Sequence, residues 1–256
     1  MDRSRILGLL STRGLGRDIR VFETVDSTSE ELKRVLAGGP CECLVLAESQ
    51  TAGRGRSSNA WHSPPGVNLY FSFSVSTGEL EDRDIFPLSA ALGVGLHRAL
   101  SARTSKRLSI KWPNDLYLEG KKLAGILCEI VRQAGAGTFL VAGIGVNVNA
   151  STFPQEIVEK ATSLFLHEMA IFDREELLAS ILNETEPVLG ECMEKGIGSL
   201  LGEYRRRCSF WGRRIRIDGD EGIMRDISPR GGLLLERDDG SLVEIFAGSV
   251  ELLPPR

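Results

Sequence analysis

The chain has 256 residues, of which 42% are hydrophobic and 26% are charged, and its formal net charge is −4 at pH 7. This length suits a globular protein with one large core and a small added domain. The acidic balance argues against a dedicated nucleic-acid-binding protein, because such proteins usually carry a basic surface. The first apolar run is too short for a signal peptide, and the longest one is too short to cross a membrane.

The five cysteines and three histidines are scattered along the chain. Their spacing predicts neither a disulfide framework nor a zinc site, which fits a reducing cytoplasm, where we expect the protein to reside. His62, His97 and His167 lie far apart and in unlike contexts. The sequence therefore does not indicate a Ser-His-Asp arrangement, and we expect no nucleophilic side chain in catalysis. We assign no side chains as metal ligands.

The first half of the chain predicts strands alternating with helices. A strand begins at residue 21, and a helix runs from residues 26–30 to residue 36, with Ser27 and Glu30 in the spacing of a capping box. Residues 44–48 and 68–75 form strands on either side of a polar loop. Residues 86–98 form a buried helix.

That polar loop, residues 50–56 followed by Trp61, carries the most informative pattern. Two glycines alternate with Arg54 and Arg56, so the backbone can approach a ligand while two guanidinium groups converge on it. The pattern is typical of a phosphate site, and the Trp61 indole can stack on a base. The alternative is an exposed Gly/Arg linker.

A second cluster lies about sixty residues further on, at residues 111–115 and 121–127. Strands at 108–112, 115–118 and 122–131, with a turn at Glu119 and Gly120, predict a β-hairpin that brings the two parts together. Asp115 and Lys122 on adjacent strands can handle a metal or an amine on one side and a carboxylate or phosphate on the other. The alternative is a surface ion pair beside a turn.

The last part of the chain changes character twice. Residues 138–148 form a strand in which Gly143 and Gly145 lack the third glycine of a dinucleotide-binding motif. Residues 160–207 are mainly helical, with one helix through 173–189. From residue 211, short strands at 214–217, 222–227, 232–236 and 242–245 predict a small β-barrel.

These motifs, in this order, resemble those of a biotin protein ligase, from about residue 20 to the C-terminus. The resemblance implies an α+β fold, with a mixed sheet covered by helices on one side, as in class II aminoacyl-tRNA synthetases, and an SH3-like C-terminal barrel. It divides the chain into a catalytic domain, residues 1–208, and a C-terminal domain, residues 209–256. About twenty residues precede the catalytic part, too few for a DNA-binding domain. We therefore expect a monofunctional ligase without sequence-specific DNA binding.

The resemblance also implies the chemistry. Biotin and ATP form biotinyl-5′-AMP and pyrophosphate, with Mg²⁺ held largely by the ATP phosphates, and biotin then passes to a lysine of a biotin carboxyl carrier protein. The implied catalytic residues are Arg54, Lys122 and Asp115. The implied biotin-binding residues are Ser27, Thr28, Ser29, Gln50, Gly53, Arg54, Gly55, Arg56, Lys122 and Gly125. The implied nucleotide-binding residues are Arg54, Arg56, Trp61, Lys111, Asn114, Lys122 and Asn147.

Two positions depart from the family pattern: Ser29 stands where an asparagine is usual, and Asn59 where an arginine is frequent. We expect Asn59 to weaken retention of the adenylate. A lipoate ligase or octanoyl transferase is the nearest enzymatic alternative, although polar groups such as Gln50 and Ser27 suit a ureido ring better than a linear acyl chain. A biotin-sensing protein that binds the adenylate without transferring it is the non-enzymatic alternative. Homodimers are possible through exposed sheet edges.

Overall fold

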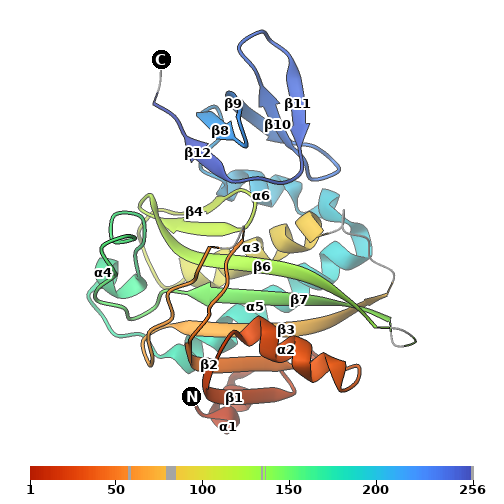
Figure 1. Ribbon diagram of the computed structural model, residues 1–256, viewed down its shortest axis with the longest axis vertical. Helices are drawn as coiled ribbons and strands as arrows, with labels where there is room; N and C mark the ends of the chain where they lie inside the picture. Colours follow the sequence, from red (N-terminus) through yellow and green to blue (C-terminus); the bar gives the residue numbers. More distant parts are fainter. Residues whose placement is uncertain (57–58, 79–84, 134, 136, 255–256) are drawn as a thin grey trace.

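The computed structural model describes residues 1–254, apart from 57–58, 79–84, 134 and 136. Its main element is a seven-stranded mixed sheet in which only the first two strands pair in parallel (Figure 1). In spatial order the strands are β1 (Ile19–Val25), β2 (Leu44–Gln50), β3 (Leu69–Gly78), β7 (Gly137–Val146), β6 (Lys121–Gln133), β5 (Asp115–Leu118) and β4 (Leu108–Lys111).

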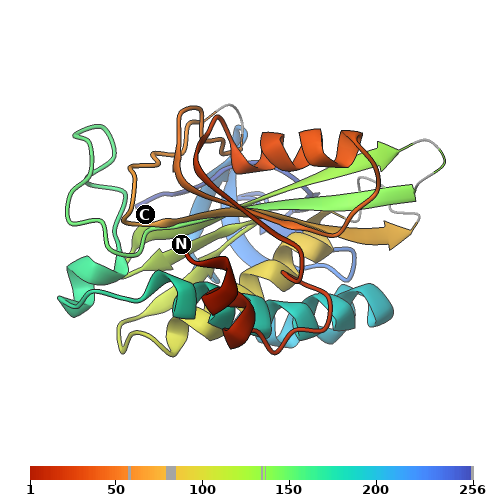
Figure 2. The same cartoon turned by 90° about the horizontal axis from the view of Figure 1, so that it is seen from below.

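Helices cover both faces of this sheet, so the expectation of helices on one side is wrong. The helices α3 (Ile85–Ser101) and α5 (Arg174–Lys195) lie on one face, and α2 (Thr28–Ala37) lies on the other (Figure 2). Leu44 and Leu46 of β2 belong to the α3–α5 core, whereas Val45 packs with Leu32 and Leu36 of α2. A strand that is buried on both faces has a continuous run of apolar residues, and residues 44–47 form such a run.

Short helices complete the main unit: α1 (Arg3–Leu9), α4 (Leu164–Glu168), the 3₁₀ turn η2 (Ile197–Ser199) and α6 (Leu201–Arg207). Helix α1 is absent from the sequence prediction, and α5 continues past the predicted end at residue 189 although it contains Pro187. In the part of the chain described here, no helix combines the length and apolar character that crossing a membrane requires.

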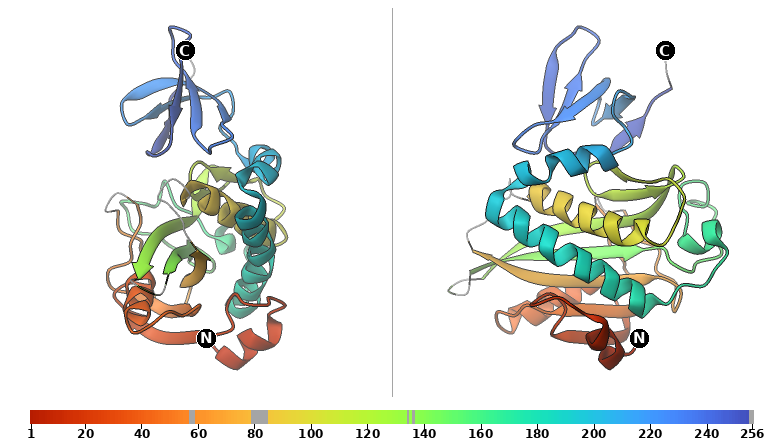
Figure 3. Two further views of the ribbon diagram at one scale, coloured as in Figure 1. Left: turned by 90° about the vertical axis from the view of Figure 1, so that its right-hand side faces the viewer. Right: turned by 180° about the vertical axis from the view of Figure 1, so that it is seen from behind.

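A second, antiparallel sheet follows α6 and lies beyond it at one end of the main sheet (Figure 3). Its spatial order is β11 (Leu242–Ile245), β10 (Leu233–Glu236), β9 (Asp220–Ile227), β8 (Arg214–Ile217) and β12 (Val250–Leu252). The four predicted strands are confirmed, and β12 was missed because only three residues form it. Arg205 of α6 donates to Asp226 of β9 at 2.5 Å, which joins the two units.

Candidate active site

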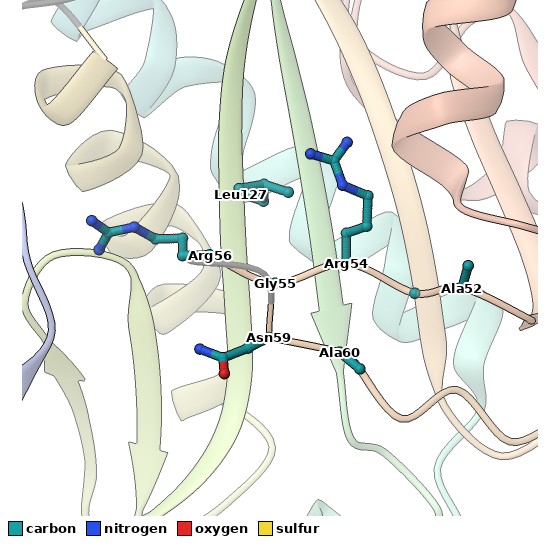
Figure 4. Close-up of a pocket in the computed structure, with 8 residues that line it drawn as sticks. Ala52, Arg54, Gly55, Arg56, Asn59, Ala60 and Leu127 are labelled. Atoms are coloured by element: carbon teal, nitrogen blue, oxygen red, sulfur yellow. The ribbon is translucent and has the colours of Figure 1, made fainter.

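A cavity of about 1140 Å³ opens between the main sheet, the 50–61 loop, the β4–β5–β6 segment and the C-terminal sheet. A neighbouring hollow of about 450 Å³ is formed mostly by the loop itself (Figure 4). The predicted site residues that line the larger cavity are Ser27, Thr28, Ser29, Gln50, Arg54, Gly55, Arg56, Trp61, Lys111, Asn114, Asp115, Lys122, Gly125 and Asn147. Gly53 lines the smaller one. The predicted juxtaposition of the loop and the hairpin is therefore present.

One end of the cavity is neutral and is built on the N-terminus of α2. Ser27 precedes the helix, but its side chain accepts no helix N–H, so the predicted capping box is wrong. The Thr28 backbone N–H instead donates to Gln50 Oε1 at 2.9 Å, and Glu30 bonds Lys33 and Arg54. Because Gln50 replaces the serine as cap, the Ser27 hydroxyl remains available to the cavity.

The Gln50 amide has a fixed orientation. A backbone N–H can only donate, so the Gln50 oxygen faces Thr28 and its nitrogen faces Ser63. Gln50 Nε2 donates to Ser63 Oγ at 2.9 Å, and Ser63 Oγ donates to the Trp61 carbonyl at 3.0 Å. A Cβ at Gly53 would lie 2.5 Å from that same carbonyl, so only glycine fits beside this network. One Gln50 N–H remains for a ligand.

The floor of the cavity is a pair of glycines on adjacent strands. Gly125 of β6 pairs with Gly145 of β7, and the Trp61 indole lies directly on them. A Cβ at Gly145 would come within 2.4 Å of the indole. The Lys122 ammonium lies 5.4 Å from the centre of the Trp61 ring. Among the described atoms, the buried Trp61 Nε1 has no hydrogen-bond partner, and it packs against Gly145.

Lys122 and Asp115 form an ion pair in the cavity wall, with Nζ and Oδ1 2.8 Å apart. The hairpin creates this pair: β5 and β6 are antiparallel, and the turn between them has positive φ at Glu119 and Gly120. The predicted hairpin is confirmed. A Cβ at Gly125 would lie 3.4 Å from Asp115 Oδ1, so the glycine leaves room beside the pair.

The two arginines of the loop point in different directions, so the predicted convergence is wrong. Arg54 bonds Glu30 of α2 and, at 3.3 Å, Glu129 of β6. Arg56 donates to Asn114 Oδ1 and to the Gly248 carbonyl, each at 3.3 Å. In Figure 4 the Arg54 side chain points upward, whereas the Arg56 side chain points to the left, away from Arg54. The carboxylates of Glu30 and Glu129 attract Arg54, and their proximity to the loop could not be predicted from local sequence patterns.

The other predicted residues are held by protein groups as well. The Asn147 side chain donates to the Thr162 carbonyl at 2.9 Å and fastens the end of β7 to the segment before α4. Asn114 donates to the Ile126 carbonyl. Lys111 Nζ lies 3.2 Å from the Tyr117 hydroxyl, and burial lowers the pKa of this lysine. A nearby anion would favour the charged form of this lysine and so oppose the effect of burial.

The donor set fits a phosphate-held metal better than a protein-held one. In the described ranges, no group of three or more His, Cys, Asp or Glu side chains could hold an ion. Asp115 offers one carboxylate, and it is already paired with Lys122. Mg²⁺ commonly takes one or two carboxylates together with substrate phosphates, which this arrangement permits.

Sequence reasoning missed Ser63, Ser72 and Gly248, which contact the predicted residues. Ser72 Oγ lies 2.8 Å from Thr28 Oγ1 and 3.0 Å from Ser29 Oγ. The strand 69–75 alternates serine with aromatic residues, and such buried serines were the available signal.

The comparisons with known proteins agree with this geometry. A model of the biotin/lipoate A/B protein ligase family matches residues 21–149, which contain the loop, the hairpin and the glycine floor. The chain belongs to this family. A model of the biotin protein ligase C-terminal domain matches residues 211–253. The resemblance to biotin protein ligases predicted from the sequence is thus confirmed.

Individual relatives extend the match over nearly the whole chain. The bifunctional ligase/repressor BirA of Escherichia coli is 32% identical over 98% of this chain and 78% of its own length. The biotin–[acetyl-CoA-carboxylase] ligase of Mycobacterium tuberculosis is 32% identical over 90% of this chain and 86% of its own length. The structure of the Aquifex aeolicus biotin protein ligase, in complex with biotin and ATP, superposes with a TM-score of 0.81 at 31% identity, covering 93% of this chain and all of that one.

Proposed function

We propose that this chain joins biotin to AMP with release of pyrophosphate and then transfers biotin to a lysine of a biotin carboxyl carrier protein. The chain is similar to a biotin–[acetyl-CoA-carboxylase] ligase and to the Aquifex aeolicus biotin protein ligase, whose structure holds biotin and ATP. The observation that carries the proposal is the single cavity in which a neutral, hydroxyl-rich end meets a cationic end around a glycine floor.

The neutral end is where we place the biotin ring. The ureido group carries both N–H donors and a carbonyl acceptor, and the Ser27 hydroxyl together with the remaining Gln50 N–H offers complementary partners. Thr28, Ser29, Gly53, Gly55 and Gly125 shape this end. The polar lining suits biotin better than lipoate, whose linear chain would require an apolar tunnel.

The cationic end is where we place the phosphates. Biotin carboxylate and the α-phosphate repel one another, and Lys122 and Arg56 reduce that repulsion while fixing the attack geometry. Arg54 contributes after release from Glu30 and Glu129. Trp61, Lys111, Asn114 and Asn147 hold the remainder of the nucleotide, and Mg²⁺ supplies charge neutralisation on its phosphates when bound.

Asp115 is the group we assign to the second half-reaction. An acceptor lysine has a pKa of about 10.4 when free and must lose a proton before it attacks the mixed anhydride. The Asp115 carboxylate, 2.8 Å from Lys122, can orient the incoming ammonium and take up its proton. The free amine then forms the amide bond with the acyl carbon, while the bond from that carbon to the phosphate oxygen breaks and AMP leaves.

The finer architecture forms part of the same proposal. We assign residues 1–208 to a catalytic domain of the class II aminoacyl-tRNA synthetase type and residues 209–256 to an SH3-like domain. The Gly248 carbonyl accepts a hydrogen bond from Arg56, and this contact joins the second domain to the loop beside the cavity. We further propose a cytoplasmic location.

One incubation tests the function. The protein is mixed with ATP, labelled biotin and a carboxyl carrier domain, and pyrophosphate and labelled carrier are measured, with lipoate as competitor. Labelled carrier is expected, with little competition. Pyrophosphate without labelled carrier would favour a sensor, and preferential use of lipoate would favour the lipoate ligase alternative.

A further inference from the structure

We infer that Ser72, buried behind the cavity, is a positioning residue for biotin recognition, an inference that rests on the proposed function. Ser72 lies in the middle of β3, is fully buried and does not line the cavity. Its hydroxyl lies 2.8 Å from Thr28 Oγ1 and 3.0 Å from Ser29 Oγ. One side chain thus holds the hydroxyls of two consecutive residues that do line the cavity.

The hydroxyls form a relay whose direction can reverse. Each hydroxyl has one proton to donate, and Thr28 Oγ1 can give its proton either to Gln50 Oε1, 3.3 Å away, or to Ser72. If Thr28 donates to Gln50, Ser72 donates to Thr28, Ser29 donates to Ser72, and the Ser29 oxygen is left to accept. If Thr28 donates to Ser72, Ser72 donates to Ser29, and the Ser29 proton is free.

Either direction therefore offers a ureido ring a matched partner without moving a heavy atom. The first direction suits a ligand N–H at Ser29, and the second suits a ligand carbonyl. Reorienting hydroxyl protons in a buried network avoids the cost of unpaired polar groups, which is high in a low-dielectric interior. Ser72 is the link through which Thr28 and Ser29 are coupled.

Packing around Ser29 leaves little room for other hydrogen-bond partners of its hydroxyl. Ser72 pairs in register with Gly143 of β7, and a Cβ at Gly143 would lie 2.4 Å from Ser29 Oγ. Ser29 is 4% exposed, and within the described residues its hydroxyl bonds with Ser72 Oγ. Without Ser72, the hydroxyls of Thr28 and Ser29 lose the group that orients them.

The test is Ser72→Ala, compared with Ser74→Ala as a matched control. Ser74 lies two residues further along the same strand and is 1% exposed; it donates to the Cys41 carbonyl at 2.8 Å and accepts from the Cys43 N–H at 3.1 Å, outside the cavity lining. Both variants lose a buried hydroxyl, so both are expected to lower Tm. Only Ser72→Ala is expected to raise KM for biotin, by about five- to thirty-fold, with KM for ATP and kcat for pyrophosphate release within about twofold.

A double-mutant cycle shows whether Ser72 acts through Ser29. The effect of Ser72→Ala on KM for biotin is expected to shrink when Ser29→Ala is already present, because the two changes break the same link. Should Ser72→Ala fail to fold, Ser72→Cys keeps nearly the same volume with a weaker donor, and an intermediate KM for biotin is expected.

The unaltered protein is assayed first, so that two failures stay distinct. If it makes no biotinyl-AMP, the proposed function falls and the inference falls with it. If it does, and Ser72→Ala leaves KM for biotin where Ser74→Ala leaves it, the relay is refuted while the ligase function stands. An equal rise in KM for biotin and ATP would also overturn it, because that is general damage to the site.

Discussion

The two ends of the cavity are built in opposite ways. The neutral end rests on continuous secondary structure: the start of α2, the end of β2 and the middle of β3, joined by hydrogen bonds of 2.8–3.0 Å. The charged end is assembled from a loop, a hairpin and the C-terminal sheet, which meet through contacts such as Arg56 with Gly248 at 3.3 Å. A pocket that is already formed favours selective binding. A pocket assembled from loops allows charged side chains to move onto a phosphate when it binds.

The largest expected effect is the loss of activity on removing Lys122 at the charged end, compared with removing the exposed neighbour Lys121. Lys122→Ala is expected to slow pyrophosphate release about 10²- to 10³-fold, because the lysine stabilises charge that develops in the reaction. The neighbouring Lys121, 42% exposed in its side chain and 3.9 Å from Glu159, is the control, and Lys121→Ala should change the rate less than twofold. Equal losses in the two variants would remove Lys122 from the mechanism.

The two arginines give the next prediction. Arg56→Ala should speed release of biotinyl-AMP about tenfold or more, because Arg56 reaches both the hairpin and the C-terminal sheet. Arg54→Ala should have a smaller effect, since Glu30 and Glu129 already neutralise that side chain. Release is followed with labelled adenylate by filter binding. A larger effect at Arg54 would mean that the loop rearranges fully when the adenylate binds.

The glycine floor can be tested by adding one methyl group. Gly145→Ala would place a Cβ 2.4 Å from the Trp61 indole, and we expect a loss of about 1–3 kcal/mol in the free energy of unfolding. Gly190→Ala is the control, because that helical position has nothing within 4 Å and should gain about 0.5–1 kcal/mol. Denaturant unfolding measures both. A neutral Gly145→Ala would show that Trp61 moves away freely.

The last prediction concerns the support of the β4 strand and depends on pH. Burial and the adjacent Arg207 lower the pKa of His97 to about 4, and its Nε2 lies 3.2 Å from the Leu108 carbonyl of β4. The unfolded histidine binds a proton near pH 6.5, so stability should fall as pH drops from about 6.5 towards 4. His97→Asn removes this titrating group. The slope of the unfolding free energy against pH should then fall by up to about 1.4 kcal/mol per pH unit, which corresponds to one proton. An unchanged slope would contradict the assignment.

Sequence patterns predicted the elements whose signals are local. The hairpin followed from the Glu119 and Gly120 turn, and the C-terminal strands followed from their flanking turns. The side of the sheet on which α2 packs was missed, although the apolar run at 44–47 contained the information. The predicted site residues gather around the two adjoining cavities, but their partners could not be predicted, because Arg54 with Glu129 and Thr28 with Ser72 are contacts between distant segments.

We propose that both ends of the cavity act on one biotinyl-AMP molecule. A single-turnover experiment uses labelled biotin and ATP without an acceptor, and a carboxyl carrier domain is added afterwards. We predict stoichiometric pyrophosphate release with the adenylate retained on the protein, and then transfer of the label to the carrier as AMP appears. Retained biotin without pyrophosphate release, or pyrophosphate release that Lys122→Ala does not affect, would show that the two ends do not act on one biotinyl-AMP molecule.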